Sequence, residues 1–265
     1  MKPSRIITLL TDFGTKDPYV GAMKGVILRI NPNAVVVDIS HEIAPQDVTE
    51  AAFKMLGYIP FFPRGTIHVC VVDPGVGSKR RAVAVQTSDS YLVGPDNGVF
   101  TLASKKFGCE RAVALENKKY FSAEVSRTFH GRDIFAPVAA HLSRQVRLEA
   151  FGRKIGNLRF LRWPEPKIAR GQLKGEIIHF DRFENAITNI DEKTLKGFLG
   201  RANPLVSVKG IEIRELASSY ERKGINGPCA IIDSYGFLEV AVFLGKAREL
   251  FGLKLGDAVL VRKIR

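Results

Sequence analysis

Residues 66–81 read TIHVCVVDPGVGSKRR and join an apolar, β-branched run to a glycine-rich turn that begins at Asp73. Such a run is typical of a strand buried on both faces, as in parallel sheets. A similar run, Ile6–Leu10, precedes the turn TDFG at residues 11–14. Between the two runs, apolar residues recur at helical spacing from Pro18 to Ile30. This order of strand, helix and strand predicts an α/β domain with a mostly parallel central sheet.

The same alternation extends to about residue 160. We expect further strands at 34–37, 82–85 and 91–93, and further helices at 48–55, at 100–107 and from about Ile134. After the stretch WPEP at 163–166, the sequence pattern changes and predicts short strands with turn residues between them. The sequence therefore predicts an α/β domain over residues 1–162, a linker over 163–172, and a smaller mostly-β domain, barrel-like or sandwich-like, over 173–265.

The chain has 265 residues and a formal net charge of +13, with 40 Lys and Arg against 27 Asp and Glu. The excess is spread evenly, and the longest basic run is only Lys79-Arg80-Arg81. Since a nucleic-acid site usually concentrates charge on one face or tail, we expect no nucleic-acid partner. No apolar run has the length of a membrane span or of a signal-peptide core, so we expect a soluble, cytoplasmic protein without a membrane partner.

The sequence offers no pattern for a metal centre or a disulfide scaffold. Its three cysteines, at positions 70, 109 and 229, are an odd number and far apart, without a CxxC pair. Its five histidines are scattered and form neither an HxxxH nor an HExxH motif. We therefore expect no bound metal and no disulfide framework.

The position of two aspartates indicates where a ligand could bind. Asp12 and Asp73 each follow a predicted strand, and ligands of open parallel sheets bind beyond the carboxyl ends of the strands. A second polar cluster, SRTFHGRDIF at 126–135, comes just before a predicted helix. Each residue also has a plain structural explanation: an aspartate can cap a turn, His130 can be a hydrogen-bonded structural histidine, and Arg80 can be solvated surface.

Several motifs taken together point to a known family. They are TDFG at 11–14, INPNA at 30–34, VVDPGVGSKRR at 71–81, GPDNG at 94–98, SRTFHGRDIF at 126–135, FDRFENAITNI at 180–190 and DSYGFLEVAVFLG at 233–245. In this order and spacing the chain resembles, over nearly its whole length, the S-adenosylmethionine hydroxide adenosyltransferase family, which is related to the fluorinases and chlorinases.

The resemblance implies a reaction and a catalytic triad. Water would attack the ribose C5′ of S-adenosyl-L-methionine and release adenosine and L-methionine, with no further cofactor. The water site of the family falls on Asp73, Arg80 and His130, and all three residue types match. An Asp–His pair can accept the proton of the water while the arginine fixes its position, and either Asp73 or His130 could be the acceptor.

The resemblance also implies the substrate-binding residues. Asp12 matches a carboxylate that binds the two ribose hydroxyls, and Thr128 and Phe129 match the wall beside the ribose. In the C-terminal part, Asp181, Phe183 and Asn185 fall on the segment for the methionine amino group and the adenine, and Ser234 on a contact to the methionine carboxylate. Members of the family that resemble this chain form homotrimers with the active sites at subunit interfaces, which we therefore expect here.

One position departs from the family pattern. The usual DxFGN reads Asp181-Arg182-Phe183-Glu184-Asn185, so a glutamate replaces the glycine. If this position needs a positive φ, Glu184 would strain the loop and place an extra carboxylate near a cationic substrate.

Two alternative functions stay open. The first is halide transfer to C5′, as in the chlorinases, although a buried Asp73 would repel a halide. The second is a non-catalytic protein that binds an adenosyl ligand, although an intact triad speaks against it.

Overall fold

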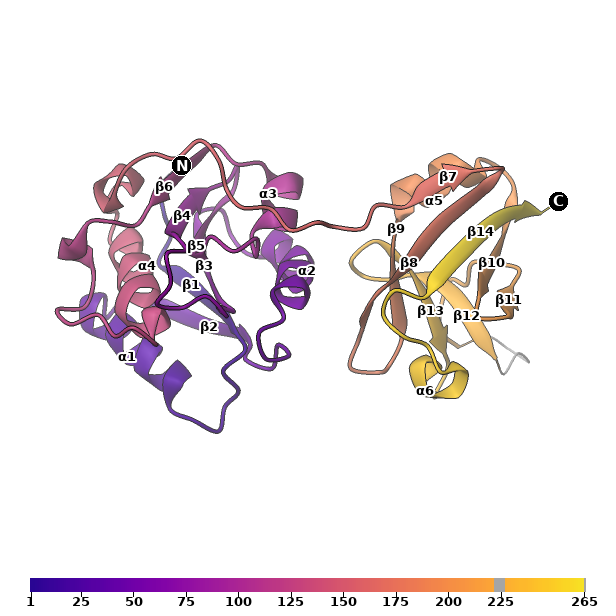
Figure 1. The fold of residues 1–265 in the computed structure, drawn as a ribbon, viewed down its shortest axis with the longest axis horizontal. Helices are drawn as coiled ribbons and strands as arrows, with labels where there is room; N and C mark the ends of the chain where they lie inside the picture. Colours follow the sequence, from indigo (N-terminus) through magenta and orange to yellow (C-terminus); the bar gives the residue numbers. More distant parts are fainter. Residues whose placement is uncertain (222–226, 265) are drawn as a thin grey trace. The chain divides into compact units, whose positions relative to one another are not determined.

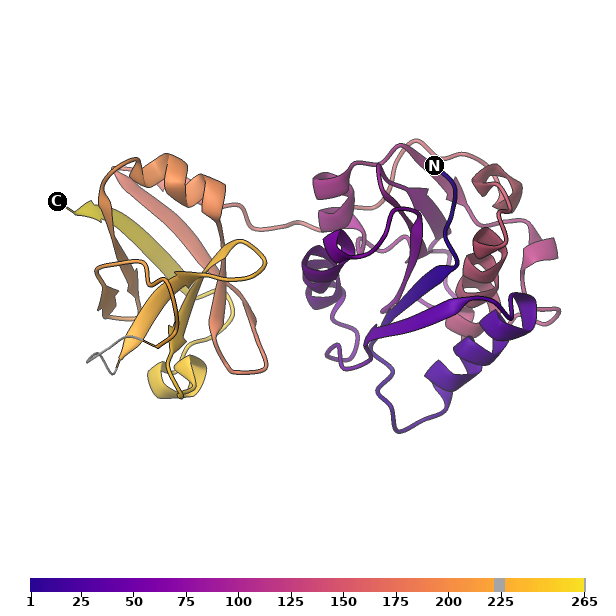
Figure 2. The same cartoon turned by 180° about the vertical axis from the view of Figure 1, so that it is seen from behind.

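The computed structural model describes residues 1–221 and 227–264 of the chain, shown in Figures 1 and 2. The chain forms two compact units, Met1–Leu161 and Arg162–Arg265. Each unit has its own buried apolar core, and the two are described in turn.

The N-terminal unit is built on a six-stranded sheet in the order β2-β1-β3-β5-β4-β6. Its strands are β1 (Ile6–Thr11), β2 (Val35–Ser40), β3 (Thr66–Val71), β4 (Ala82–Gln86), β5 (Ser90–Pro95) and β6 (Arg111–Ala114). The pairs β1–β2, β1–β3 and β3–β5 are parallel, whereas β4 is antiparallel to both β5 and β6. The predicted α/β class with a mostly parallel sheet is confirmed. The antiparallel edge strand β6 was not predicted.

Two layers of helices cover the two faces of this sheet (Figure 1). The helices α1 (Tyr19–Ile30) and α4 (Ala136–Ser143) pack on one face, and α2 (Val48–Tyr58) and α3 (Thr101–Phe107) on the other. Short helical turns lie at Ile59–Phe61, Lys118–Tyr120 and Leu148–Phe151, and a wide π-type turn, Gly131–Phe135, leads into α4. The start that we predicted for α1 is one residue early, because Pro18 takes the N-cap position.

The parallel pairing of β1 and β3 positions the two candidate aspartates. Thr11 of β1 lies opposite Val71 of β3 in the register of the pair. Asp12 and Asp73 follow these residues by one and two positions, and both line one cavity beyond the carboxyl ends of the strands. This is the edge at which open α/β sheets bind ligands.

The C-terminal unit is an antiparallel, nearly closed barrel, which confirms the predicted mostly-β class. Its strands are β7 (Lys167–Ala169), β8 (Gln172–Phe180), β9 (Ala186–Asp191), β10 (Asn203–Val208), β11 (Ile211–Ile213), β12 (Pro228–Ile232), β13 (Phe237–Val242) and β14 (Ala258–Ile264). The order is β11-β10-β14-β8-β9-β13-β12, with β7 paired to β8. A bridge between Leu216 and Ala230 brings the chain after β11 against β12, at the open side of the barrel.

Two helices complete the C-terminal unit: α5 (Glu192–Leu199) and α6 (Ala247–Phe251). The sequence analysis missed α5. Asp191 caps it by accepting a hydrogen bond from the backbone N–H of Thr194 at 2.9 Å. The strand β7 lies inside the stretch 163–172 that we expected to be a linker, and it pairs with β8 from Lys167 onward.

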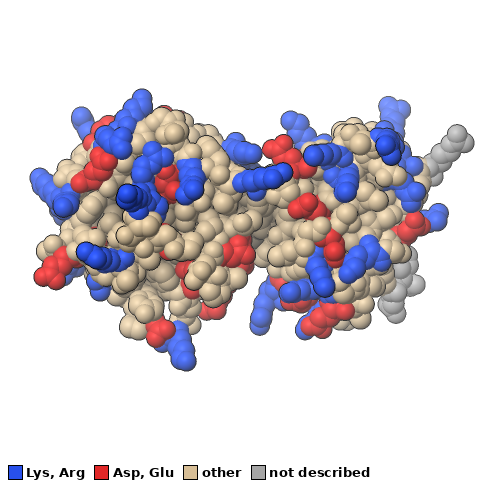
Figure 3. Space-filling model, in the orientation of Figure 1, with Lys and Arg blue, Asp and Glu red and all other residues tan. Residues whose placement is uncertain are grey.

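Charged side chains of both signs are intermingled on the face shown in Figure 3. None of the helices in the described parts of the chain combines the length and the apolar character that crossing a membrane requires.

Candidate functional site

Asp73, Arg80 and His130 form a hydrogen-bonded cluster in the N-terminal unit. The carboxylate of Asp73 accepts hydrogen bonds from Nε of Arg80 at 2.9 Å and from Nη2 of the same guanidinium. Nη2 of Arg80 also lies 2.8 Å from Nδ1 of His130. The side chains of Asp73 and Arg80 are only 5% and 6% exposed, so this ion pair is largely shielded from water. The structure thus brings together the three residues that the resemblance assigned to catalysis.

The local chain explains how these side chains are held. Directly after β3, a tight turn is closed by a hydrogen bond from the Val76 N–H to the Asp73 carbonyl at 3.1 Å. Gly77 in this turn has φ +74° and packs against the backbone of Arg127, so a side chain fits there neither conformationally nor sterically. On the other side of the cluster, the carboxylate of Asp133 accepts a hydrogen bond from the Ser126 N–H at 2.8 Å and thereby fixes the loop that carries His130.

The hydrogen bond with Arg80 defines the tautomer of His130. A guanidinium can only donate, so Nδ1 of His130 accepts, and the proton of the neutral imidazole is on Nε2. Burial, followed by the positive charge of Arg80, lowers the pKa of His130 from its ordinary value of 6.5, while the charges of Asp73 and Asp133 act in the opposite direction. His130 is therefore neutral at pH 7 and presents an N–H donor at Nε2.

The cluster borders a cavity of about 380 Å³ whose wall includes Asp12, Asp73, Thr128, Phe129 and His130. Oδ2 of Asp12 accepts a hydrogen bond from the backbone N–H of Gln46 at 2.8 Å, which orients the carboxylate. All the N-terminal residues that the resemblance assigned to the substrate thus lie around one cavity.

The sequence analysis missed part of this wall. Phe13 and Tyr19 pack edge-on around Phe129, with ring centroids 5.2–5.8 Å apart, and all three rings line the cavity. Gln46, with φ +67°, lines it as well. The aromatic residues lie near TDFG and in SRTFHGRDIF, so proximity to these motifs was the available signal.

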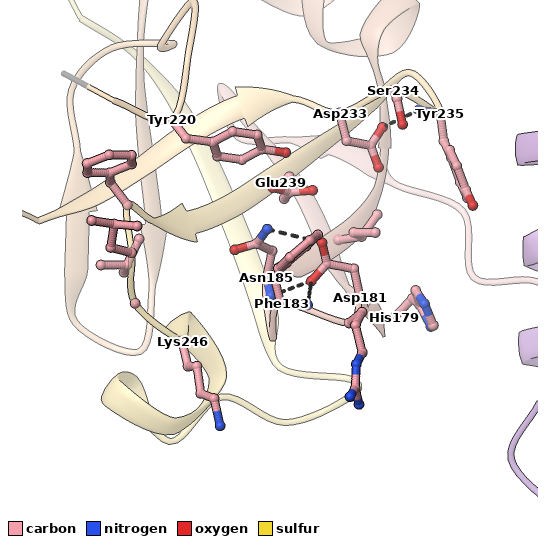
Figure 4. A pocket seen from close by; sticks show the side chains of 16 residues that line it. His179, Asp181, Phe183, Asn185, Tyr220, Asp233, Ser234, Tyr235, Glu239 and Lys246 are labelled. Atoms are coloured by element: carbon pink, nitrogen blue, oxygen red, sulfur yellow. Dashed lines mark hydrogen bonds between the residues drawn. The ribbon is translucent and has the colours of Figure 1, made fainter. Parts of the chain in front are cut away.

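A second cavity, of about 710 Å³, lies in the C-terminal unit (Figure 4). Asp181, Phe183, Asn185 and Ser234, the four predicted C-terminal residues, all line it. Oδ1 of Asp181 accepts hydrogen bonds from the backbone N–H groups of Phe183 at 2.9 Å and Asn185 at 2.8 Å, and Oδ2 accepts from the Asn185 amide at 3.1 Å. Phe183 is 72% exposed, so its ring face is free for stacking.

Glu184, the departure from the family pattern, has φ +63°. This positive φ means that the backbone of Glu184 is strained, because the left-handed region costs free energy for a residue that has a Cβ. Two contacts with Arg248 hold the loop at Glu184. The backbone N–H of Arg248 donates to the Glu184 carbonyl at 3.0 Å, and Nη1 of Arg248 lies 3.5 Å from Oε2 of Glu184. The carboxylate is thus turned toward a cation of this same unit.

Three further acidic or phenolic residues of the second cavity, Tyr220, Asp233 and Glu239, were not predicted. Glu239 had a sequence signal: it is the one charged residue in the apolar strand FLEVAV at 237–242. In the parts of the chain that the structure describes, no group of three or more His, Cys, Asp or Glu side chains is arranged to hold a metal ion.

Comparison with known proteins identifies the family. Residues 7–152 match the model of the SAM hydroxide adenosyltransferase N-terminal domain, and residues 175–260 match that of the C-terminal domain. The chain is 38% identical to a protein of Methanocaldococcus jannaschii and 40% identical to one of Thermus thermophilus, both named (R)-S-adenosyl-L-methionine hydrolase. These alignments cover 96% of this chain and 94% and 98% of the relatives.

More distant relatives and a solved structure agree with this result. A fluorinase of Actinoplanes is 28% identical over 97% of both chains. The crystal structure of an uncharacterized conserved protein from Thermotoga maritima superposes with a TM-score of 0.90 at 36% identity, covering 97% of this chain and all of the other. With both of its units matched and close relatives over nearly its full length, the chain belongs to the SAM hydroxide adenosyltransferase family.

Proposed function

We propose that this protein hydrolyses S-adenosyl-L-methionine to adenosine and L-methionine, with Asp73, Arg80 and His130 as the water-activating triad. The observation that carries this proposal is the hydrogen-bonded cluster of the three side chains, with a buried Asp73–Arg80 ion pair, beside a cavity that Asp12 also lines. The activity in the names of the relatives from Methanocaldococcus and Thermus supports the same reaction.

The reaction is a displacement at the ribose C5′. The water oxygen forms a bond to C5′ while the bond from C5′ to sulfur breaks, and the electron pair of that bond neutralises the sulfonium. Methionine leaves as a neutral thioether, so the leaving group needs no acid. The water loses one proton and becomes the 5′-hydroxyl of adenosine. The protein therefore has to position one water in line with the breaking bond and accept one proton.

The hydrogen bonds support a division of these tasks among the three residues. Neutral His130 carries its proton on Nε2, so it donates to the water oxygen and orients it rather than taking a proton from it. Arg80 bridges the other two residues and holds both in place. Asp73 is the one anion of the cluster, so we assign it as the proton acceptor, using lone pairs that Arg80 leaves free.

The remaining predicted residues take binding roles. Asp12 accepts hydrogen bonds from the two ribose hydroxyls, and Thr128 and Phe129 form the wall beside the ribose. In the C-terminal unit, Asp181, Phe183 and Asn185 bind the methionine amino group and the adenine, and Ser234 the methionine carboxylate. We further propose a homotrimer in which the site combines units of neighbouring subunits. Analytical ultracentrifugation should give three times the chain mass of 29.3 kDa, and a monomer would contradict this assembly.

The descriptor (R) in the names of the relatives extends the proposal to the substrate's configuration at sulfur. The two sulfonium epimers point the methyl group in different directions when C5′ and sulfur are held in line with the attacking water. We therefore expect preference for the (R) epimer, which a chiral separation of a partly hydrolysed epimer mixture would measure.

A product assay tests the reaction itself. Purified protein is incubated with S-adenosyl-L-methionine in chloride-containing and in chloride-free buffer, and the products are separated by liquid chromatography. Adenosine and methionine in both buffers are expected. A 5′-chloro nucleoside that disappears without chloride would replace the proposal with halide transfer, and bound but unconverted substrate would leave a binding protein.

A further inference from the structure

His41 is a buried titratable residue that the proposed reaction has not used. Its side chain is only 5% exposed and does not line the cavity beside the triad. Nδ1 of His41 lies 2.9 Å from the hydroxyl oxygen of Thr11, a fully buried residue at the end of β1. Since Asp12 directly follows Thr11, His41 contacts the chain next to the carboxylate that we assigned to the ribose.

The main chain of His41 holds the other end of the same turn. The backbone N–H of Gly14 donates to the carbonyl of His41 at 2.7 Å, and the backbone N–H of Phe13 donates to Oγ1 of Thr11 at 3.2 Å. Asp12 and Phe13, which line the cavity, therefore lie between two contacts with one residue. A turn that is held at both ends has little freedom to move, so its carboxylate is in place before a ligand arrives.

A second pair of groups fixes the ring of His41. Nε2 of His41 lies 3.1 Å from Oδ1 of Asp38 on β2, and Oδ2 of Asp38 accepts a hydrogen bond from Nζ of Lys24 on α1 at 2.5 Å. A carboxylate can only accept, so it favours the tautomer of His41 with the proton on Nε2. Nδ1 then accepts a hydrogen bond from the Thr11 hydroxyl. The contacts thus run from α1 through β2 and His41 to the turn after β1.

We propose that His41 is a positioning residue for the ribose site: it holds the turn at residues 11–14 so that the Asp12 carboxylate meets the ribose hydroxyls. This inference rests on the proposed function for the identity of the ligand. His41 neither touches the ligand nor takes part in proton transfer. Its loss should weaken nucleoside binding and leave the proposed triad intact, because the triad is held by its own hydrogen bonds and by the loop at 126–133.

The chain contains a matched control for this contact. Nδ1 of His68 lies 2.9 Å from Oγ1 of Thr8, and both residues are fully buried. This pair consists of the same two residue types, but it joins the neighbouring strands β1 and β3 upstream of Thr11. Removing either histidine should lower the stability of the fold, whereas only the loss of His41 should affect the ligand.

Isothermal titration calorimetry with adenosine measures the ribose site without turnover. His41→Phe removes both ring nitrogens, whereas the amide of His41→Asn can take the place of Nδ1 and accept from the Thr11 hydroxyl. We expect adenosine to bind about tenfold more weakly to His41→Phe, the effect of a lost hydrogen bond, and within about twofold of the wild type to His41→Asn. The control His68→Phe should change the affinity less than about twofold, as an independent site does. Urea denaturation measures the stability of each variant.

Two results would overturn the assignment. Unchanged affinity in His41→Phe would mean that the turn holds Asp12 without the histidine, and an equal loss in His68→Phe would mean that affinity follows stability alone. If His41→Phe fails to fold, Thr11→Val decides, since valine is similar in shape to threonine but lacks the hydroxyl. Weaker adenosine binding in Thr11→Val supports the positioning role, and wild-type affinity overturns it.

A double-mutant cycle tests whether His41 acts through Asp12. Asp12→Asn already removes the charge that binds the ribose hydroxyls, so adding His41→Phe should weaken adenosine binding by less than about a further twofold. Additive losses would mean that His41 affects binding by another route and would contradict the proposal.

Steady-state kinetics with S-adenosyl-L-methionine gives a separate readout. His41→Phe should raise KM about tenfold and keep kcat within about twofold, because it removes a binding interaction and leaves the chemistry unchanged. A fall in kcat at unchanged KM would place His41 in the chemistry and contradict the positioning role.

Failure of this inference differs from failure of the proposed function. Wild-type hydrolysis combined with unchanged adenosine affinity in His41→Phe would overturn the positioning role alone. Adenosine binding that depends on His41, without wild-type turnover, would overturn the hydrolase and keep the positioning role. A wild-type protein that does not bind adenosine would overturn both.

Discussion

Replacing Asp73 by asparagine tests the proposed catalytic cluster most directly. In the wild type, both oxygens of Asp73 accept hydrogen bonds from Arg80, and the two side chains are 5% and 6% exposed. Asparagine has nearly the same shape and keeps one acceptor oxygen. It removes the negative charge, however, and turns an amide N–H₂ toward a guanidinium that can only donate.

Two separate losses should follow, one in stability and one in turnover. Breaking one partner of a buried ion pair costs about 3–5 kcal/mol, because the other charge is left unpaired. Loss of a proton acceptor typically lowers a rate by about 10²–10⁴, or roughly 3–5 kcal/mol of transition-state stabilisation. Since we assign Asp73 to the attacking water and not to the substrate, substrate affinity should change much less than turnover.

The assay combines urea denaturation with initial rates of adenosine formation. Arg80→Met and the double variant Asp73→Asn/Arg80→Met separate folding from chemistry: the double variant should regain stability, since no unpaired charge is buried, but no activity. Asp89→Asn is the matched control, because Asp89 pairs with Arg64 at 2.7 Å on the surface, where the side chains are 58% and 76% exposed. It should lose less than about 1 kcal/mol and keep full activity.

Two results would refute this reasoning. Wild-type turnover in Asp73→Asn would remove Asp73 from the chemistry, and the proton acceptor would have to be sought elsewhere. A stability loss no larger than that of Asp89→Asn would show that the pair is solvated, and the argument from burial would fail with it.

Three further predictions concern Asp12, Glu184 and His130. Asp12→Asn should weaken the binding of both adenosine and S-adenosyl-L-methionine about tenfold, the cost of a charge-assisted hydrogen bond; Asp17→Asn, outside the cavity, is the calorimetric control, and equal affinities would remove Asp12 from the ribose site. Glu184→Gly should be about 1 kcal/mol more stable to urea than Glu184→Ala, because both lose the ion pair but only alanine keeps a Cβ at φ +63°; equal stabilities would mean an unstrained loop. Because the pKa of His130 is lowered in the folded protein, the imidazole of the unfolded chain is protonated at a higher pH, so the free energy of unfolding should fall as the pH drops below 6.5. Denaturation at pH 5 and 7 should show a smaller fall in His130→Gln than in the wild type, and an equal fall would contradict the lowered pKa.

Much of the fold could be predicted because local patterns and tertiary structure agree. The runs at Ile6–Leu10 and in residues 66–72 became β1 and β3, since strands buried on both faces are apolar throughout. The elements that the prediction missed lack such a pattern. Strand β6 has only four residues, and α5 carries four polar residues among eight, so neither stands out from its surroundings.

The candidate site could be predicted only in part. The motifs predicted individual site residues, and all four that were predicted in the C-terminal unit line one cavity. Glu239 carried no motif role, and its single sequence signal was a charge within an apolar strand. Its environment depends on the groups around it in space, which are the phenol of Tyr220 and the carboxylates of Asp233 and Asp181, and these lie up to 58 positions away along the chain.

By itself, the sequence determined the two classes of architecture, the family and the residue types of the proposed triad, because these follow from short-range pattern and from the order of motifs. Only the tertiary structure decided the proton position on His130, the left-handed backbone of Glu184 and the burial of Oε1 of Glu239 without a hydrogen-bond partner among the described residues. The physical reason is that burial, hydrogen-bond partners and electrostatic environment belong to positions in space, and folding brings those positions together from distant parts of the chain.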